Sequence, residues 1–357
     1  MKFIKFFNEI RVNSDKKPKK VFQGFGSGAK ISQYRTKKES MNIFVKEFIA
    51  PGFKQNLEDA QEKMLAFLNE YFGYVVFKAV KPNFRYFQIP KKISYKFEVG
   101  EAWNPKSFAS MNIELITTGL SSGLPFGYEH PDRKSKMAKY FKNFFKISYL
   151  IPNFIISNGD LHSGNFVVHV QKMKGYQIDP GVAFGGNGSK EKAFLDINRL
   201  DELMRNLFSG SDWAASKKGE NNIDFRINML KISDKKLYTK ITRNFKQWEK
   251  FLGGDGIGKI NGAIDDAKRN MMQRYDVFAI ECRKQLVKHF TDVMDSEQDQ
   301  ETKTKAKENL SEMVKTLNEN LSGLRQYMIK YIDFHIKPVV KNNVNVIHEY
   351  LASQNFE

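Results

Sequence analysis

Three polar side chains in the middle of the chain have the types and spacing for chemistry at a hydroxyl group with help from a divalent cation. Asp160 and Asn165 lie five residues apart in a polar loop, and Asp179 follows nineteen residues after Asp160. A carboxylate can accept a hydroxyl proton, and carboxylate and amide oxygens are ligands that hard divalent cations prefer. Between them, the segments 166–170 and 176–179 have the pattern of a β-hairpin. We expect this hairpin to bring Asn165 and Asp179 together.

The residues around these three side chains resemble motifs of the protein-kinase-like superfamily. Asp160-Leu161-His162-x-x-Asn165 has the spacing of the catalytic loop H-R-D-L-x-x-x-N. It is closer to the aminoglycoside phosphotransferase branch, in which a His stands where protein kinases usually carry Lys. The resemblance implies that Asp160 and His162 are catalytic and that Asn165 binds the metal. The alternative is a turn that is merely rich in Asp, Asn and Gly.

The segment after the hairpin resembles a variant of the D-F-G element of kinases. Asp179-Pro180-Gly181 has Pro where that element has Phe, and the resemblance implies that Asp179 binds the metal. The run from Asp179 to Gly185 also resembles the corresponding loops of type II phosphatidylinositol 4-kinases and secretory-pathway kinases. No A-P-E element follows, and the helix expected from 193 begins soon after. A long phosphorylatable activation loop therefore does not fit.

A glycine-rich turn near the N-terminus fits a phosphate-binding role. Gly24, Gly26 and Gly28 follow a strand-like start, and Lys46 lies in the strand-like segment 42–49. Glycines allow the backbone to approach phosphates closely, and a lysine places a positive charge on them. Together they resemble the glycine-rich loop and the V-A-I-K lysine of kinases, which implies nucleotide binding. An ordinary glycine-rich loop is the alternative reading of the turn alone.

Lys46 would then need an acidic partner to hold its orientation. Glu58 and Glu62 lie on one face of the helix predicted over 56–72, and Glu62 is nearer the expected offset. Either glutamate could equally face solvent. By position alone, 111–118 would be the strand and hinge that receive adenine.

The pattern of elements predicts an α+β protein. The first third is rich in strand-like segments with one helix, strand-like pieces recurring at 74–80, 84–89, 93–99 and 111–116. From about 225 onward nearly all of the chain has helical periodicity, with a loop at 253–258 and a break at Pro338. We predict a basic segment at 1–19, a bilobal protein-kinase-like fold with lobes at 20–110 and 111–224, and an appended C-terminal α-helical domain at 225–357.

The composition is that of a folded protein with a strong positive charge. Lys and Arg number 58 against 40 Asp and Glu, which gives a formal charge of +18. Such an excess favours polyanions, although it could also be a compositional bias of a Lys-rich chain. Neither an aromatic RNA-binding signature nor zinc-finger spacing occurs, so no nucleic acid partner is expected. The single cysteine, Cys282, excludes an intramolecular disulfide framework, and no apolar run is long enough to predict a transmembrane segment.

Basic residues gather on one face of a helix predicted near 235–250. Lys236, Lys240, Arg243 and Lys246 are spaced by four, three and three residues, with aromatic residues between them. This face is either a solvated surface or a site for inositol phosphates or phosphoinositides.

The whole combination resembles the atypical effector kinases that intracellular bacterial pathogens secrete into host cells. The resemblance implies transfer of the γ-phosphoryl group of ATP to a hydroxyl acceptor such as a protein Ser/Thr, with Mg²⁺ or Mn²⁺. It also implies activation by inositol hexakisphosphate, binding to phosphatidylinositol 4-phosphate or another anionic lipid, and a place in host cytoplasm and on membrane surfaces. Two alternatives are a small-molecule or phosphoinositide kinase and a non-catalytic lipid-binding adaptor with a remnant kinase core.

Overall fold

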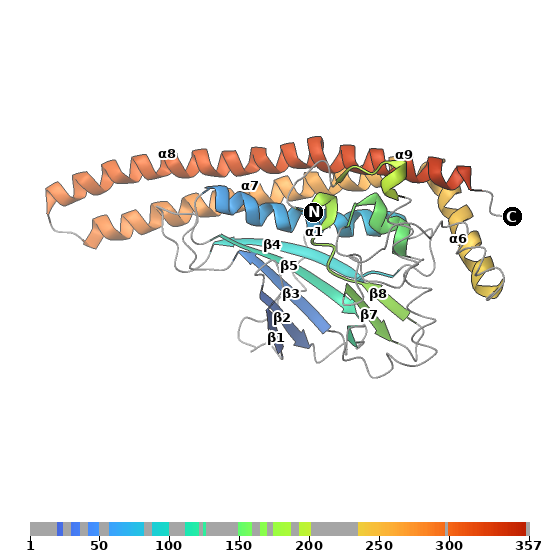
Figure 1. The fold of residues 1–357 in the computed structure, drawn as a ribbon. Helices are drawn as coiled ribbons and strands as arrows, with labels where there is room; N and C mark the ends of the chain where they lie inside the picture. Colours follow the sequence, from blue (N-terminus) through green and yellow to red (C-terminus); the bar gives the residue numbers. More distant parts are fainter. Residues whose placement is uncertain are drawn as a thin grey trace, which may run out of the picture.

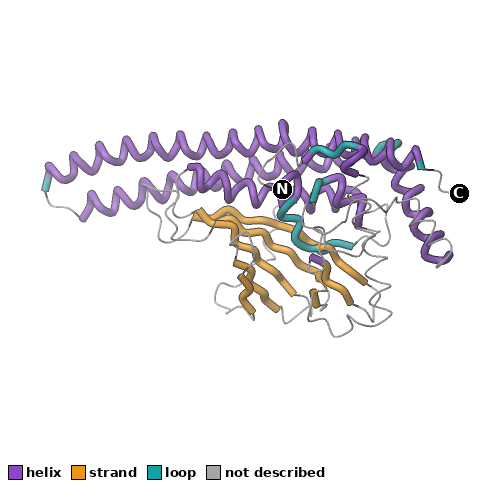
Figure 2. Tube along the Cα trace, viewed as in Figure 1, coloured by secondary structure: helices purple, strands orange, loops and turns teal. Residues whose placement is uncertain are grey.

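The protein is a mixed α+β structure in which most of the described residues lie in helices (Figures 1 and 2). The computed structural model describes residues 20–23, 30–35, 42–49, 57–81, 88–99, 111–120, 124–125, 149–158, 165–169, 174–186, 193–200, 235–296 and 299–354. The predicted α+β class is therefore confirmed.

The first sheet has five antiparallel strands in the order β1-β2-β3-β5-β4. The strands are β1 (Lys20–Gln23), β2 (Lys30–Arg35), β3 (Asn42–Ile49), β4 (Lys92–Val99) and β5 (Met111–Leu120). The strands predicted at 42–49, 93–99 and 111–116 are confirmed. The predicted boundary between 110 and 111 falls at the start of β5, which pairs with both β3 and β4 and so continues this sheet.

The side chains of β3 alternate between the two faces of this sheet. Ile43 and Val45 cluster with Ile116 on one face. Phe48 lies on the other face, where its ring meets Phe67 of the following helix at 5.7 Å. Because Lys46 is two residues from Phe48, its side chain shares the face that is turned toward this helix.

That helix, α1, spans Leu57–Val80 and is longer than predicted. The expected end at Gly73 and the strand expected at 74–80 were both wrong. Gly73 lies inside the helix, and its lack of a side chain leaves room for Pro180: a Cβ atom at Gly73 would lie 2.9 Å from the Pro180 Cβ. The aromatic and β-branched residues after Gly73 resemble a strand in sequence because the helix is buried on nearly all sides at this end.

A second, smaller sheet follows the centre of the chain. It contains β6 (Leu124–Pro125), β7 (Phe166–His169) and β8 (Lys174–Gln177) in that order. The predicted hairpin is thus confirmed, with its second strand starting two residues earlier than expected. A helix at 149–155 packs beside it, and the short 3₁₀ helix η5 (Ala183–Gly185) follows β8.

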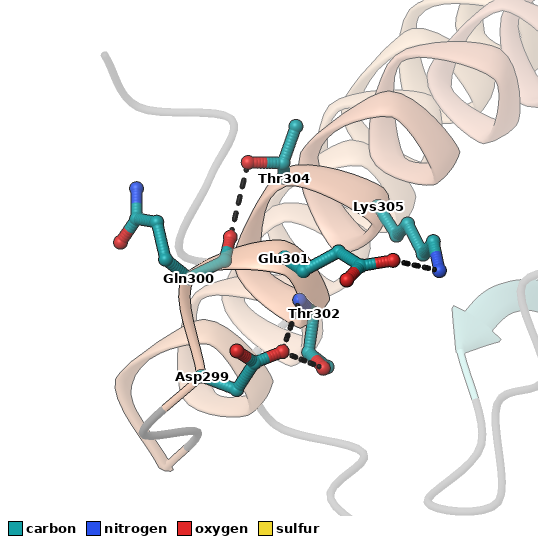
Figure 3. A network of polar contacts seen from close by, with 6 residues as sticks. All are labelled: Asp299, Gln300, Glu301, Thr302, Thr304 and Lys305. Atoms are coloured by element: carbon teal, nitrogen blue, oxygen red, sulfur yellow. Dashed lines mark hydrogen bonds and ion pairs between the residues drawn. The ribbon is translucent and has the colours of Figure 1, made fainter.

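The C-terminal part is helical, as predicted for the residues that the structure describes. It consists of α6 (Lys235–Leu252), α7 (Gly256–Ser296), α8 (Gln300–Tyr331), the π-helix η6 (Ile332–Ile336) and α9 (Lys337–Ser353). The loop predicted at 253–258 is shorter, because α7 already begins at Gly256. Helix α8 starts at a capping Asp299, whose carboxylate accepts the Thr302 backbone N–H at 2.9 Å and the Thr302 hydroxyl at 2.8 Å (Figure 3).

Pro338 does not break the last helix. It stands in the first turn of α9, where its missing N–H costs little. The π-helix before it supplies the wider turn, in which the Lys337 N–H bonds to the Ile332 carbonyl.

The long helices pack directly on the first sheet rather than standing apart from it. The Arg274 guanidinium of α7 donates to the Tyr95 carbonyl of β4 at 2.9 Å, and the Tyr275 and Phe97 rings meet at 5.9 Å. One continuous buried cluster runs from Phe48 through α1 to Leu351. The expected boundary at 224/225 lies outside the described residues, but no separate core accompanies the helices that follow it. None of the helices in the described part of the chain is both long and apolar enough to cross a membrane.

Candidate functional site

Three charged side chains from three separate elements meet beside the first sheet. The Lys46 Nζ of β3 lies 2.6 Å from Glu70 Oε2 of α1 and 2.8 Å from Asp179 Oδ1, just after β8. We call these three residues the charged triad. The side chains of Lys46 and Glu70 are 11% and 4% exposed, whereas that of Asp179 is 38% exposed. Asp179 is therefore the member of the triad that is most accessible to a ligand in solvent.

Burial and mutual attraction act in opposite directions on these groups. Burial lowers the pKa of Lys46, but Glu70 and Asp179 raise it above its ordinary value, so Lys46 stays charged. Burial raises the pKa of Glu70 to about 7, and Lys46 only partly offsets this. With all three groups ionised, one positive and two negative charges leave the triad with a net charge of −1. The surplus charge lies next to the exposed Asp179, where a cation would be stabilised.

The raised pKa of Glu70 predicts a pH dependence of stability. The folded pKa lies above the unfolded value of 4.5, so the folded state binds more protons than the unfolded state between about pH 4.5 and pH 7. This contribution to stability is complete below pH 4.5 and is lost as the pH rises through 7. In wild type, the titration of Glu70 should lower the unfolding free energy by up to about 1.4 kcal/mol for each pH unit of this window. We expect this part of the pH dependence to be absent from Glu70→Gln. Urea unfolding at pH 5, 6, 7 and 8 measures it, and equal slopes in the two proteins would contradict the assigned burial of the charge.

The backbone at Asp179 is held in an uncommon conformation. Its φ angle is +53°, in the left-handed region that non-glycine residues seldom occupy. The Asp179 N–H donates to the Tyr74 hydroxyl of α1 at 2.9 Å, which fixes this conformation. At Gly181 a Cβ atom would lie 3.0 Å from Asp179 Oδ1 and 3.7 Å from Lys46 Nζ. The absence of a side chain at Gly181 therefore leaves room for the lysine and the carboxylate to meet.

The β7–β8 hairpin places Asn165 next to the segment that carries Asp179. The Ile178 N–H donates to the Asn165 carbonyl at 2.9 Å, and Asn165 is buried. The two predicted metal ligands thus lie on adjacent pieces of backbone, as the hairpin pattern predicted. Within the described residues, no three His, Cys, Asp or Glu side chains gather to bind a metal. One amide, one carboxylate and the oxygens of a phosphate ligand nevertheless fit Mg²⁺, which usually takes few protein ligands.

Buried amides that sequence reasoning missed support this loop. The Asn153 and Gln177 side chains exchange two hydrogen bonds of 2.7 and 2.6 Å, and the Asn158 amide donates to Asn153 at 2.8 Å. From α9, the Asn343 amide donates to the Ser157 hydroxyl at 2.9 Å and also contacts nearby carbonyls. These bonds hold Ser157 and Asn158, at the start of the segment that contains the predicted catalytic loop. The available signal was an amide inside an otherwise apolar run, as at Asn153 between Ile151 and Ile156.

The partner of Lys46 is Glu70, so the prediction of Glu62 was wrong. Glu62 and Glu58 are exposed on α1, two or more turns before Glu70. Glu70 lies on the same stripe of α1 as the buried Phe67 and Tyr74. A carboxylate within an apolar stripe needs a compensating charge, and this was the signal that could have identified it.

Only some of the other predicted site residues lie within the part of the chain that the structure describes. Gly24, Gly26, Gly28, Asp160 and His162 lie outside the described residues. Lys236 lies on α6 with Lys240, Arg243 and Lys246, of which Arg243 and Lys246 are exposed. The aromatic residues Phe245 and Trp248 of the same helix are buried and belong to the core rather than to this basic face.

A search of protein-family models and of curated proteins found no match to this chain.

Proposed function

We propose that this chain is a kinase-like phosphotransferase that moves the γ-phosphoryl group of ATP to a hydroxyl acceptor. The observation that carries the proposal is the charged triad, in which Lys46 forms ion pairs with Glu70 and Asp179. A lysine held between a helix glutamate and a metal-binding aspartate is the arrangement that kinases require for transfer. Further support comes from the order of elements, with α1 inserted between β3 and β4 of an antiparallel five-stranded sheet.

Each residue of the candidate site has a role in this proposal. Glu70 holds the Lys46 ammonium, which binds the phosphates of ATP through its positive charge. Asn165 and Asp179 would hold Mg²⁺ or Mn²⁺, which neutralises the developing phosphate charge when it is bound. Asp160 accepts the proton of the acceptor hydroxyl, and His162 assists charge neutralisation. Most of the catalysis is then positioning and electrostatic stabilisation, in a bilobal kinase-like fold.

The acceptor is a protein Ser/Thr in the first version of the proposal, and one observation favours a second version. At Gly185, a Cβ atom would lie 3.1 Å from the Ala193 Cβ, so the segment after Asp179 returns closely on itself. So short a segment offers little platform for an extended peptide. This observation favours a small-molecule or phosphoinositide acceptor.

Transfer of label from [γ-³²P]ATP tests the proposal directly. The full chain is incubated with Mg²⁺ or Mn²⁺ and with protein, lipid and sugar acceptors, each with and without inositol hexakisphosphate. Labelled product in any arm supports the proposal, and its chemical class identifies the acceptor. The absence of product in every arm, with no bound nucleotide, would favour a non-catalytic lipid-binding adaptor.

We also propose that the basic face of α6 binds polyanions at host membranes, as expected for a secreted effector. Support comes from the exposure of Arg243 and Lys246 on this helix. We expect Arg243→Glu with Lys246→Glu to weaken flotation on liposomes containing phosphatidylinositol 4-phosphate by roughly tenfold or more. Lys307→Glu with Lys315→Glu on α8 makes the same change in net charge and should have a much smaller effect. Equal losses in both double variants would mean that only the overall charge matters.

A further inference from the structure

The C-terminal helices contact α1 at the residue that precedes Glu70 of the charged triad. At the end of α8, the Tyr331 hydroxyl donates to the Asn69 Oδ1 atom at 2.6 Å. Asn69 directly precedes Glu70 on α1 and is buried. The residue that Tyr331 bonds to is therefore next in sequence to Glu70, whose carboxylate forms an ion pair with Lys46.

The same helices also hold the segment that follows Asp179. The Tyr331 ring stacks on the His335 ring of η6, with centroids 4.8 Å apart. The His335 Nε2 atom lies 2.8 Å from the Phe184 carbonyl oxygen. The Asn69 amide completes the circuit, because its Nδ2 donates to the Gly186 carbonyl at 2.7 Å. We call Asn69, Tyr331 and His335 the polar bridge.

The segment held by the polar bridge needs such support. Phe184, Gly185 and Gly186 have φ angles of +55°, +83° and +65°, so all three residues of this segment have the positive φ that favours glycine. A non-glycine residue persists there only where its surroundings fix it. The contacts to His335 and Asn69, together with a bond from the Phe184 N–H to the Ile156 carbonyl, provide this fixation.

The π-helix that contains His335 is itself held in place by ion pairs. Asp333 pairs with Lys268 of α7 at 2.5 Å and with Lys337 at 3.4 Å. Wide helical turns of this kind are rare and frequently occur at functional sites. Because α7 packs on β4, the first sheet, the π-helix and the segment after Asp179 form one connected frame.

We propose that Tyr331 and His335 are positioning residues, which hold α1 and the 184–186 segment so that Glu70 and Asp179 meet on Lys46. The catalytic consequence of this inference rests on the proposed function. The inference deepens that function, because it makes the C-terminal helices part of the catalytic unit. Simple packing would not need this circuit of polar contacts. Loss of the Tyr331 hydroxyl removes only the link to α1 and leaves the ring stack.

The test measures the reactivity of Lys46 in the nucleotide-free protein. Full-length wild type and Tyr331→Phe are treated with a small amount of acetic anhydride, and mass spectrometry compares acetylation of Lys46 with that of Lys78, which is exposed on α1. If the triad loosens, Lys46 loses its ion pairs and becomes more accessible. We expect labelling of Lys46 relative to Lys78 to rise by roughly fivefold in Tyr331→Phe. Unchanged labelling would overturn the proposal.

Tyr327→Phe is the matched control. Tyr327 lies one turn earlier on α8 and stacks on Tyr331 with centroids 6.3 Å apart. Within the described part of the chain its hydroxyl has no hydrogen bond, so its removal should leave Lys46 labelling unchanged. Thermal melting of both variants reports their general stability. A rise in Lys46 labelling of the same size in Tyr327→Phe would assign the effect to looser packing and would also overturn the proposal.

Two further measurements separate this inference from the proposed function. Asn69→Ala should raise Lys46 labelling as Tyr331→Phe does, and the double variant should add little, because both changes break one bridge. Additive effects would contradict the bridge. With Mg²⁺-ATP, Tyr331→Phe should raise KM and lower kcat, whereas Tyr327→Phe should change neither. If wild type binds no nucleotide, the proposed function fails while the labelling result still decides whether the bridge positions the triad.

Discussion

Replacement of Asp179 by alanine is expected to lower phosphoryl transfer by at least about a thousandfold. The change removes the most exposed member of the triad, the carboxylate that would hold the metal. Without it, the triad would no longer hold the metal that neutralises the charge developing on the phosphates, and Lys46 loses one of its two partners. The rate of label transfer from [γ-³²P]ATP under saturating metal measures the loss.

The fold should survive this change. Lys46 keeps its ion pair with Glu70, and the buried cluster beneath the site contains no atom of Asp179. Asp196→Ala is the matched control, since Asp196 is an exposed carboxylate outside the triad. Its Oδ1 atom accepts a hydrogen bond of 2.7 Å from the Arg199 backbone N–H. Near-normal transfer by Asp179→Ala with an unchanged melting temperature would show that the metal-binding role of Asp179 is wrong.

Replacement of Asp160 by alanine should separate binding from chemistry. Asp160 lies outside the described residues, between the buried Asn158 and Asn165, and serves the acceptor hydroxyl rather than the nucleotide. We expect transfer to fall by about a hundredfold or more, while affinity for ATP stays within about twofold. Fluorescence anisotropy with a labelled ATP analogue measures the affinity.

Two outcomes for Asp160→Ala would contradict this division of roles. Transfer at the wild-type rate would mean that another group accepts the proton. A loss of nucleotide binding as large as the loss of transfer would place Asp160 in the nucleotide site. Lys46→Ala provides the comparison, since it should weaken nucleotide binding and transfer together.

Much of the first sheet and of the site could be predicted from local sequence patterns. The spacing of Asn165 and Asp179 around a hairpin predicted that both residues lie near each other, and the composition of 42–49 predicted the strand that carries Lys46. The motif also predicted that Lys46 and Asp179 serve one site, and their ion pair of 2.8 Å agrees with this.

The rest depended on packing between distant segments. The run after Gly73 is rich in Tyr, Val and Phe, which favours a strand locally, but tertiary burial on α1 overrides that preference. A glycine such as Gly73 often marks the end of a helix. Here it leaves room for Pro180, which is more than a hundred residues away in the sequence. The polar bridge joins Asn69 to Tyr331 across 262 residues, and no local pattern could indicate such a pair.

Isothermal titration of the full chain with a nonhydrolysable ATP analogue tests the central claim most directly. The account predicts one nucleotide bound per chain with Mg²⁺ or Mn²⁺, and an affinity at least about tenfold weaker when EDTA removes the metal. Binding should also be weakened in Lys46→Ala. No binding to wild type with either metal, even with inositol hexakisphosphate present, would contradict the assignment of the charged triad as a nucleotide site.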